Sequence, residues 1–435
     1  MWSTLLFLCG LFFVYTVDRA FLGLLAIPIQ QETGIGDLQF GVLNSAIFWS
    51  YALCVPFAGL VGDRFDRRKV IGVAAVLWSV MTLLAGFAGG FWSLLLLVSV
   101  AITVPQTFYG PAANPLIAET YGHVKTTAMS LHQAAFYSGW FASGAVVAAL
   151  LSLFGSWRSA YFVFGTLGIV LGLVFLLRAS RKPNPVHLAI EQSINPVRPA
   201  IEQSNNPVRP AIEQSNNPNN RTIKQSLLAF FACPSALLAA SGYVLMVFVA
   251  CGYCAWGPKF VAQKFSLSPA AAGTGVMFWH YAAAFVSILL AGVATDRFVR
   301  RWPRFRLALQ VSVLVLAAPL LTLFGLAPSV TLTFAAAAAY GLLRGLFEAN
   351  QFMSIFDVVP PAFRASAIGF TNVLAGTIGA LSPVILGALS QKQGVRGLET
   401  GFSLLGLALL LAAGLMSISL FFTFRKDHDK EIVNA

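Results

Sequence analysis

Four charged side chains fall inside long apolar runs of this chain. Asp18 and Arg19 lie in the first run, and Arg344 and Glu348 lie in a run near residues 330–357. A charge at bilayer depth is costly unless it is paired or faces a water-filled cavity. Arg344 and Glu348 are four residues apart, so they share one helix face and can pair directly. Alternatively, these charged groups only neutralise one another and hold the helices together.

The two arginines place one guanidinium in each half of the chain. A guanidinium stays charged and presents a planar fork of donors that suits carboxylate or phosphate. Arg19 and Arg344 therefore favour an anionic ligand near the middle of the membrane. Further candidates for hydrogen bonds to a substrate are Tyr109, Asn114, His132, Gln133, Tyr137, Tyr253, Trp256, His280, Asn350 and Gln351. Each of these could instead be a polar residue satisfied within a helix bundle.

No motif for enzymatic chemistry accompanies these residues. The sequence has no Walker loop, no nucleotide fingerprint and no nucleophile elbow. The five cysteines all lie in apolar runs, and Cys251-x-x-Cys254 has no second Cys or His pair, so neither a disulfide framework nor a metal site is predicted. We expect a protein that is not an enzyme and needs no cofactor beyond a coupling ion such as a proton or sodium.

The elements that must position the charged residues are membrane helices. Charged residues make up 10% of the chain and its mean hydropathy is +0.77, whereas soluble domains carry about 25% charged residues. A spanning helix needs about 20 mostly apolar residues. Twelve runs qualify, at roughly 4–28, 38–62, 70–89, 92–119, 127–154, 157–178, 234–258, 269–294, 306–327, 330–357, 365–390 and 399–424.

The chain repeats itself about half its length apart. Gly59-Leu-Val-Gly-Asp63-Arg64-Phe-Asp66-Arg67-Arg68-Lys69 matches Gly292-Val-Ala-Thr-Asp296-Arg297-Phe-Val-Arg300-Arg301. We therefore predict a six-helix bundle at 1–178, a cytoplasmic linker at 179–225, a second six-helix bundle at 226–424 and a tail at 425–435. The linker carries 11-residue repeats rich in Pro and Asn, starting at Ala189 and Ala200, and such segments are typically disordered.

The distribution of Lys and Arg orients the bundles. Sixteen of these cations, from Arg64 to Lys426, fall on the side of the second connection, whereas the opposite loops hold only Arg158, Lys259, Lys264, Lys392 and Arg396. Positive loops stay cytoplasmic, so both termini and the linker are expected on the cytoplasmic side of the cell membrane. The formal net charge of +12 reflects this asymmetry, and no basic stripe with interleaved aromatics suggests a nucleic-acid partner.

The repeated loop resembles the signature loop of the major facilitator superfamily, with Asp66 in place of a usual glycine. Tyr15-Thr-Val-Asp18-Arg19, Gly155-Ser-Trp157-Arg158 and Tyr253-Cys-Ala-Trp256-Gly-Pro258 resemble segments of two branches, the organic-anion:cation symporters and the spinster-like transporters. The resemblance implies an all-α membrane protein with twelve helices in two pseudo-symmetric six-helix bundles. It also implies a monomer surrounded by membrane lipid.

Family roles transfer to individual positions. Gln106 stands where the family usually has a proton-coupling glutamate, so Asp18 and Glu348 are the remaining candidates for coupling. Aligning Glu119 with Asp357 places Arg344 opposite Gln106, and Gln106 joins the candidate substrate-binding residues. The signature loops are expected to form a conformational latch, with Glu119 pairing with Arg64 and Asp357 with Arg297. The predicted latch residues are Gly59, Asp63, Arg64, Arg67, Arg68, Glu119, Asp296, Arg297 and Asp357.

Two transport functions remain open. A secondary active transporter would move a small organic anion, such as a sugar acid or carboxylate, together with protons by alternating access. Alternatively, a spinster-like carrier would move an amphipathic lipid or drug-like molecule past aromatic side chains such as Phe48, Phe108, Phe136 and Phe347. Arg19 and Arg344 favour the first function, and the aromatic residues together with Gln106 favour the second.

Overall fold

The computed structural model describes residues 2–121, 124–180, 230–299, 301–302, 304–360 and 363–427. Within these residues the chain is helical, and twelve helical stretches are long and apolar enough to span a membrane. Six precede residue 181 and six follow residue 229, as the sequence predicts. The predicted linker lies outside the described residues, apart from positions 179 and 180 at the end of α9.

The first bundle contains α1 (Trp2–Leu24), the short α2 (Ala26–Thr33), α3 (Asp37–Arg64) and α4 (Arg67–Ala85). Its fourth span is broken into α5 (Phe91–Leu94), the π-helix η1 (Leu95–Ala101), α6 (Thr103–Thr107) and α7 (Tyr109–Thr120). Helices α8 (Lys125–Phe154) and α9 (Arg158–Ser180) complete it. Pro105, Pro111 and Pro115 lie in the broken span, where each removes a backbone donor.

The second bundle contains α14 (Pro234–Lys264), α15 (Pro269–Val299), α16 (Phe305–Leu326) and α17 (Val330–Glu348). The turn of helix α18 (Met353–Phe356) follows, then α19 (Arg364–Gly379), α20 (Leu381–Gln393), α21 (Val395–Ile418) and the π-helix η5 (Ser419–Thr423). Helix α14 runs six residues beyond the predicted end at 258. Lys259 therefore lies in a helix, and the expectation that it belongs to a loop is wrong.

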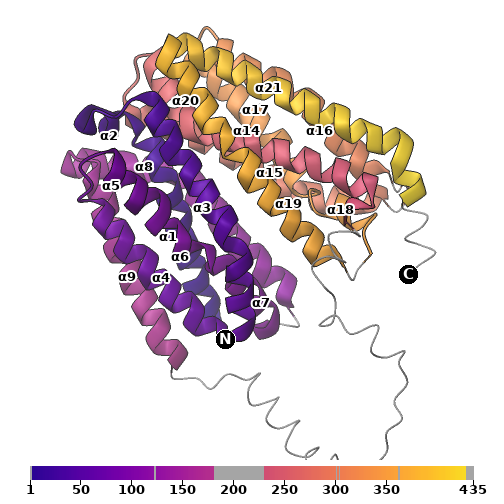
Figure 1. The fold of residues 1–435 in the computed structure, drawn as a ribbon, viewed down its shortest axis with the longest axis horizontal. Helices are drawn as coiled ribbons and strands as arrows, with labels where there is room; N and C mark the ends of the chain where they lie inside the picture. Colours follow the sequence, from indigo (N-terminus) through magenta and orange to yellow (C-terminus); the bar gives the residue numbers. More distant parts are fainter. Residues whose placement is uncertain are drawn as a thin grey trace, which may run out of the picture.

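The two bundles lie close together at one end of the molecule and diverge toward the other (Figure 1). We call the first the closed end; it holds α2, the start of α3 and the end of α20. The other is the terminal end, where α1 begins and η5 ends. Contacts between the bundles join α3 to α19 and α20, α8 to α15, and α1 to α14.

Glycines let the backbones touch along this seam. A Cβ at Gly41 would lie 2.5 Å from the carbonyl oxygen of Pro383, and one at Gly144 would lie 2.4 Å from Cα of Thr274. Small residues permit this close approach because helices in lipid associate by van der Waals packing rather than by the hydrophobic effect. The seam is therefore a close-packed contact of backbone on backbone.

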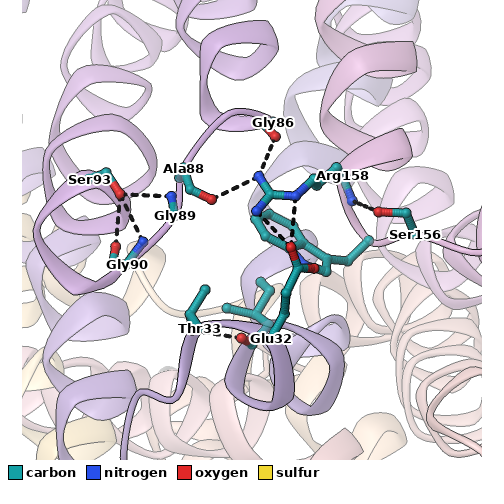
Figure 2. Close-up of polar contacts among 11 residues, drawn as sticks. Glu32, Thr33, Gly86, Ala88, Gly89, Gly90, Ser93, Ser156 and Arg158 are labelled. Atoms are coloured by element: carbon teal, nitrogen blue, oxygen red, sulfur yellow. Dashed lines mark hydrogen bonds and ion pairs between the residues drawn. The ribbon is translucent and has the colours of Figure 1, made fainter.

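A cluster of polar contacts ties three connections of the first bundle together at the closed end (Figure 2). The Arg158 guanidinium donates to Glu32 Oε1 from Nε (3.0 Å) and Nη2 (2.7 Å), and Trp157 Nε1 donates to Glu32 Oε2 at 2.5 Å. Arg158 Nη1 also donates to the carbonyl oxygens of Gly86 (2.7 Å) and Ala88 (2.8 Å). The Trp157-Arg158 segment singled out by sequence thus anchors α2 and the turn after α4.

We expect Glu32→Gln to lower the thermal midpoint by about 2 °C at pH 7, since partly exposed ion pairs contribute at most about 1 kcal/mol. Hydrogen bonds from Arg158 lower the pKa of the Glu32 carboxyl. A lowered pKa contributes stability above the ordinary value and loses it as pH falls through the lowered value. The difference between parent and variant should therefore persist from pH 8 to pH 5 and shrink below about pH 4.

Thermal unfolding in detergent across this pH range measures the effect. Lys392→Gln removes an exposed charge at the same end and should leave the midpoint unchanged. A Glu32→Gln difference that is absent, or that does not vary with pH, would show that the cluster adds no charge-dependent stability.

Candidate functional site

A cavity of about 50 Å³ lies between the two bundles, lined by residues of membrane-spanning helices. We call it the central cavity. Helices α1, α3 and α8 of the first bundle and α14 of the second supply its walls. The lining residues are Arg19, Ala20, Gly23, Asn44, Ile47, Phe48, Trp140, Cys251, Cys254 and Ala255.

Arg19 is the charged group of this cavity. Its Nε and Nη2 have no hydrogen-bond partner among the described residues. The guanidinium lies over two aromatic rings, 5.4 Å from the centroid of Tyr15 and 5.3 Å from that of Tyr51. Cation–π contacts attract the charge and fix its orientation, but the rings accept no hydrogen bond from the N–H groups in the guanidinium plane. The cavity is therefore lined by hydrogen-bond donors of Arg19 that have no acceptor among the described residues.

Asp18 does not neutralise Arg19, although the two are adjacent. Successive helical residues point about 100° apart, and Asp18 turns toward α4, where Thr82 Oγ1 donates to its Oδ2 at 3.3 Å. Its Oδ1 has no partner within the described part of the chain. The carboxyl is thus inside the first bundle while the guanidinium faces the boundary between bundles.

Arg344 has a different environment, because it is already paired. Its Nε donates to Glu348 Oε1 at 2.7 Å, and its Nη1 lies 3.0 Å from His280 Nε2. A guanidinium can only donate, so His280 Nε2 accepts and the ring proton of the neutral imidazole sits on Nδ1. The predicted pairing of Arg344 with Glu348 is confirmed.

The Arg344 cluster also bridges the two bundles. Tyr137 of α8 donates to Glu348 Oε2 at 2.6 Å. Trp140, one turn further along α8, stacks on Tyr281 of α15 with ring centroids 4.8 Å apart. Tyr281 lies 3.5 Å from Arg344 Nη1 and 3.1 Å from the Cys254 thiol. Through Trp140 and Cys254 this cluster borders the central cavity.

Several predicted substrate contacts are engaged inside one bundle instead. Tyr109 donates to the carbonyl of Leu8 at 2.7 Å and lies 2.9 Å from His132 Nε2, and both side chains are buried. Gln106 is also buried, and its Nε2 has no partner in the described chain. Asn114 and Gln133 are exposed and do not line the central cavity.

The predicted residues of the second bundle are likewise engaged elsewhere. Tyr253 packs among His280, Phe324, Tyr340 and Phe402 with no exposed surface. Trp256 Nε1 donates to the carbonyl of Pro383 at 3.0 Å, toward the closed end. Asn350 Oδ1 accepts from Arg306 Nε at 3.3 Å, toward the terminal end. None of the three lines the central cavity.

The pairings predicted for the two latch carboxylates, Glu119 with Arg64 and Asp357 with Arg297, are wrong. Glu119 pairs with Arg67, not Arg64. Asp357 accepts two hydrogen bonds from Arg306 Nη1, at 2.8 and 2.7 Å. The described side chains of Asp357 and Arg297 form no ion pair with each other. In each bundle the cation lies in the first turn of the third helix and the carboxylate at the end of the fourth span. Both pairs are internal to one bundle.

At the closed end, the two bundles are joined by an ion pair that the sequence does not predict. Lys259 of α14 donates to Asp37 at the start of α3, and both side chains are largely buried. Gln30 and Ser390 also donate to Asp37, and Gln391 Oε1 accepts from its backbone N–H. The only sequence signal was a lysine placed just after Trp256-Gly-Pro258. We call this group the closed-end gate.

Two six-helix bundles with a charged cavity between them, held together at one end, define a secondary membrane transporter. Residues 7–383 match the Major Facilitator Superfamily, and the chain belongs to that superfamily of transporters rather than to a family of enzymes.

Individual relatives agree with this assignment. The chain is 26% identical over 408 residues to the protein spinster of Drosophila melanogaster, which covers 90% of this chain and 62% of spinster. It is 25% identical over 396 residues to a probable sulfoacetate transporter of Cupriavidus necator, covering 89% of this chain and 86% of that one. A crystal structure of a bacterial homologue of the human lysosomal transporter spinster, inward-facing and unoccupied, has a TM-score of 0.77 at 20% identity, with 98% of each chain covered.

We expect Asp37→Asn to open the closed end, because it leaves Lys259 buried without its counter-charge. The double variant Asp37→Lys with Lys259→Asp should restore closure. Spin labels at the exposed positions Gln31 and Lys392, one in each bundle, report the separation of the bundles by pulsed electron paramagnetic resonance. Asp37→Asn should increase the population of molecules with a longer label-to-label distance than in the parent, and the double variant should reduce that population again.

Glu399→Gln is the matched control, since Glu399 pairs with Lys264 within the second bundle. It should leave the Gln31–Lys392 distance distribution as it is in the parent. If Asp37→Asn also leaves that distribution unchanged, the gate does not hold the bundles together.

Proposed function

We propose that this transporter moves a small organic anion, a sugar acid or other carboxylate, by alternating access and together with protons. One observation carries the proposal: Arg19 lines the central cavity with two buried N–H-bearing nitrogens that have no hydrogen-bond partner in the described part of the chain. A cation at bilayer depth without a counter-charge is costly. An anionic substrate would supply that charge.

The cavity suits one carboxylate end. A carboxylate accepts two parallel hydrogen bonds from a guanidinium, and the Tyr15 and Tyr51 rings hold Arg19 in place before the ligand arrives. Preorganised donors reduce the ordering cost of binding. The adjoining aromatic and thiol groups, Phe48, Trp140 and Cys254, would contact the rest of a small molecule.

Glu348 is the group through which proton coupling would act. As a carboxylate it accepts from Arg344 and from Tyr137 of the opposite bundle. Proton uptake on Glu348 would remove the charge that holds both donors and leave Arg344 available to an anion. A single protonation would thus change the ligand affinity of one bundle and weaken a contact between the two, as coupling requires.

The charge distribution supports an orientation with the terminal end in the cytoplasm, since loops rich in Lys and Arg stay inside. The closed-end gate then faces outward, and the conformation is inward-facing. The membrane would be the cell membrane, with the protein working as a monomer. Similarity to a probable sulfoacetate transporter over 86% of its length supports an organic anion.

The spinster-like alternative is supported by similarity to spinster over 90% of this chain and by the aromatic walls of the cavity. A carrier of an amphipathic molecule would use Phe48 and Trp140 for the apolar part. Arg19 would then serve as a structural charge or contact a polar headgroup.

A thermal-shift panel tests the anion proposal. Sugar acids, short carboxylates, uncharged sugars and lysolipids are added to the purified protein, where a ligand at one hundred times its dissociation constant stabilises by about 2.7 kcal/mol. We expect an acid to raise the midpoint, and Arg19→Gln to weaken its binding about 10- to 100-fold, the value of a charge-assisted hydrogen bond. Arg344→Gln should weaken binding less, because Arg344 is paired with Glu348.

Arg158→Gln is the control for loss of an arginine remote from the cavity. We expect it to lower the starting midpoint and to preserve the ligand-induced shift. A shift with lysolipids alone, unchanged in Arg19→Gln, would support the spinster-like alternative. If an organic acid raised the thermal midpoint equally in the parent and in Arg19→Gln, that result would contradict an anion site at Arg19.

We expect Glu348→Gln to uncouple transport from protons. In liposomes the variant should exchange substrate across the membrane but lose acceleration by an imposed pH gradient, because a glutamine cannot take up the proton. Asp18→Asn tests the second candidate carboxyl in the same assay. Coupling that survives Glu348→Gln and disappears in Asp18→Asn would assign the proton to Asp18 instead.

A further inference from the structure

An apolar groove of about 410 Å³ lies on the first bundle, away from the central cavity. It runs between α3 and α4 and has α6 as its floor. Val61 and Phe65 form one wall, Val73 and Leu77 the other. Phe65, Val73 and Leu77 are 60%, 46% and 48% exposed, so the groove opens on the surface that faces lipid.

Small side chains leave this groove hollow. Ala74 of α4 and Pro105 of α6 lie along it, and α6 is set apart from the rest of the fourth span by the π-helix η1. The volume is within the range of sites that bind small molecules. A hollow of this kind on a lipid-facing surface is filled by hydrocarbon, since apolar walls without contacting atoms forfeit dispersion energy.

Lys69 is the one charged residue among those that line the groove. It is exposed and forms no salt bridge with the described residues. It lies in the first turn of α4, at the terminal end, beside Arg64 and Arg68. The nearby Asp66 carboxylate is occupied as the helix cap, accepting from the backbone N–H groups of Arg68 at 2.9 Å and Lys69 at 3.4 Å.

We propose that this groove binds one acyl chain of an anionic phospholipid, with the phosphate-bearing headgroup against Lys69. The apolar walls match the chain, and the lysine at the membrane-surface end of the groove matches an anionic headgroup. Basic side chains at the end of a transmembrane helix attract anionic lipid in this way. The lipid comes from the leaflet at the terminal end and fills the space between α3 and α4 beside the broken fourth span.

Native mass spectrometry of the full chain in detergent tests this site. The probes are phosphatidylglycerol and phosphatidylcholine with identical acyl chains. We expect the parent to retain phosphatidylglycerol about fivefold better, the ratio for one lysine–lipid interaction. Lys69→Gln should bring the two lipids to equal retention, whereas Lys392→Gln, which removes an exposed lysine at the closed end, should keep the preference.

Filling the groove tests the acyl-chain part. Val73→Trp should reduce retention of both lipids, and Leu77→Trp provides a second filling variant if the first does not fold. Leu411→Trp, at a position 58% exposed on α21, adds the same side chain elsewhere on the lipid-facing surface and should retain lipid as the parent does.

Either of two results overturns the proposal: a folded groove-filling variant that retains phosphatidylglycerol like Leu411→Trp, or a headgroup preference that survives Lys69→Gln. Because the anion-binding assay uses Arg19, failure of the lipid experiment leaves the transport proposal untouched.

Discussion

Charge inside a low-dielectric membrane has to be compensated, and at two places in the described structure that compensation crosses the boundary between the bundles. Lys259 of the second bundle is paired with Asp37 of the first. Glu348 is held by Arg344 from its own bundle and by Tyr137 from the other. At these two places a charged group of one half has a partner in the other half. Any separation of the bundles at these points leaves a charge or donor unsatisfied.

The glycine seam has a different physical basis. At Gly41 and Gly144 the backbones of the two bundles are too close for a Cβ, so the contact depends on shape and excludes intermediate arrangements. Close-packed surfaces of this kind are bistable: they are either in register or apart. Ion pairing and packing coincide at the closed end, which explains why the bundles meet there and diverge at the other end (Figure 1).

The fold was predictable from sequence because membrane helices are specified by composition and length. The sequence locates all twelve spans, with the largest boundary error at α14, which runs six residues beyond its predicted end. Arg344 pairs with Glu348 because residues four apart share a helix face. Partners from different helices were not predictable in the same way. Asp37 and Lys259 are separated by more than two hundred residues, and Tyr109, Tyr253 and Asn350 find partners that depend on how their helices rotate in the bundle. Helix period fixes a face, but only packing decides what that face meets.

Equivalent positions in the two halves carry the same ion pair at one place and different side chains at another. Arg67 with Glu119 and Arg306 with Asp357 join the third helix to the end of the fourth span in each bundle. Because both pairs are internal, they are preserved when a bundle moves as a rigid body, whereas the Asp37–Lys259 ion pair and the Tyr137–Glu348 hydrogen bond must break. Pseudo-symmetry also places Gln106 opposite Arg344, so the second bundle carries an ion pair where the first has a neutral amide. The proposed proton-dependent step therefore falls on the second bundle, whereas the proposed anion contact at Arg19 falls on the first.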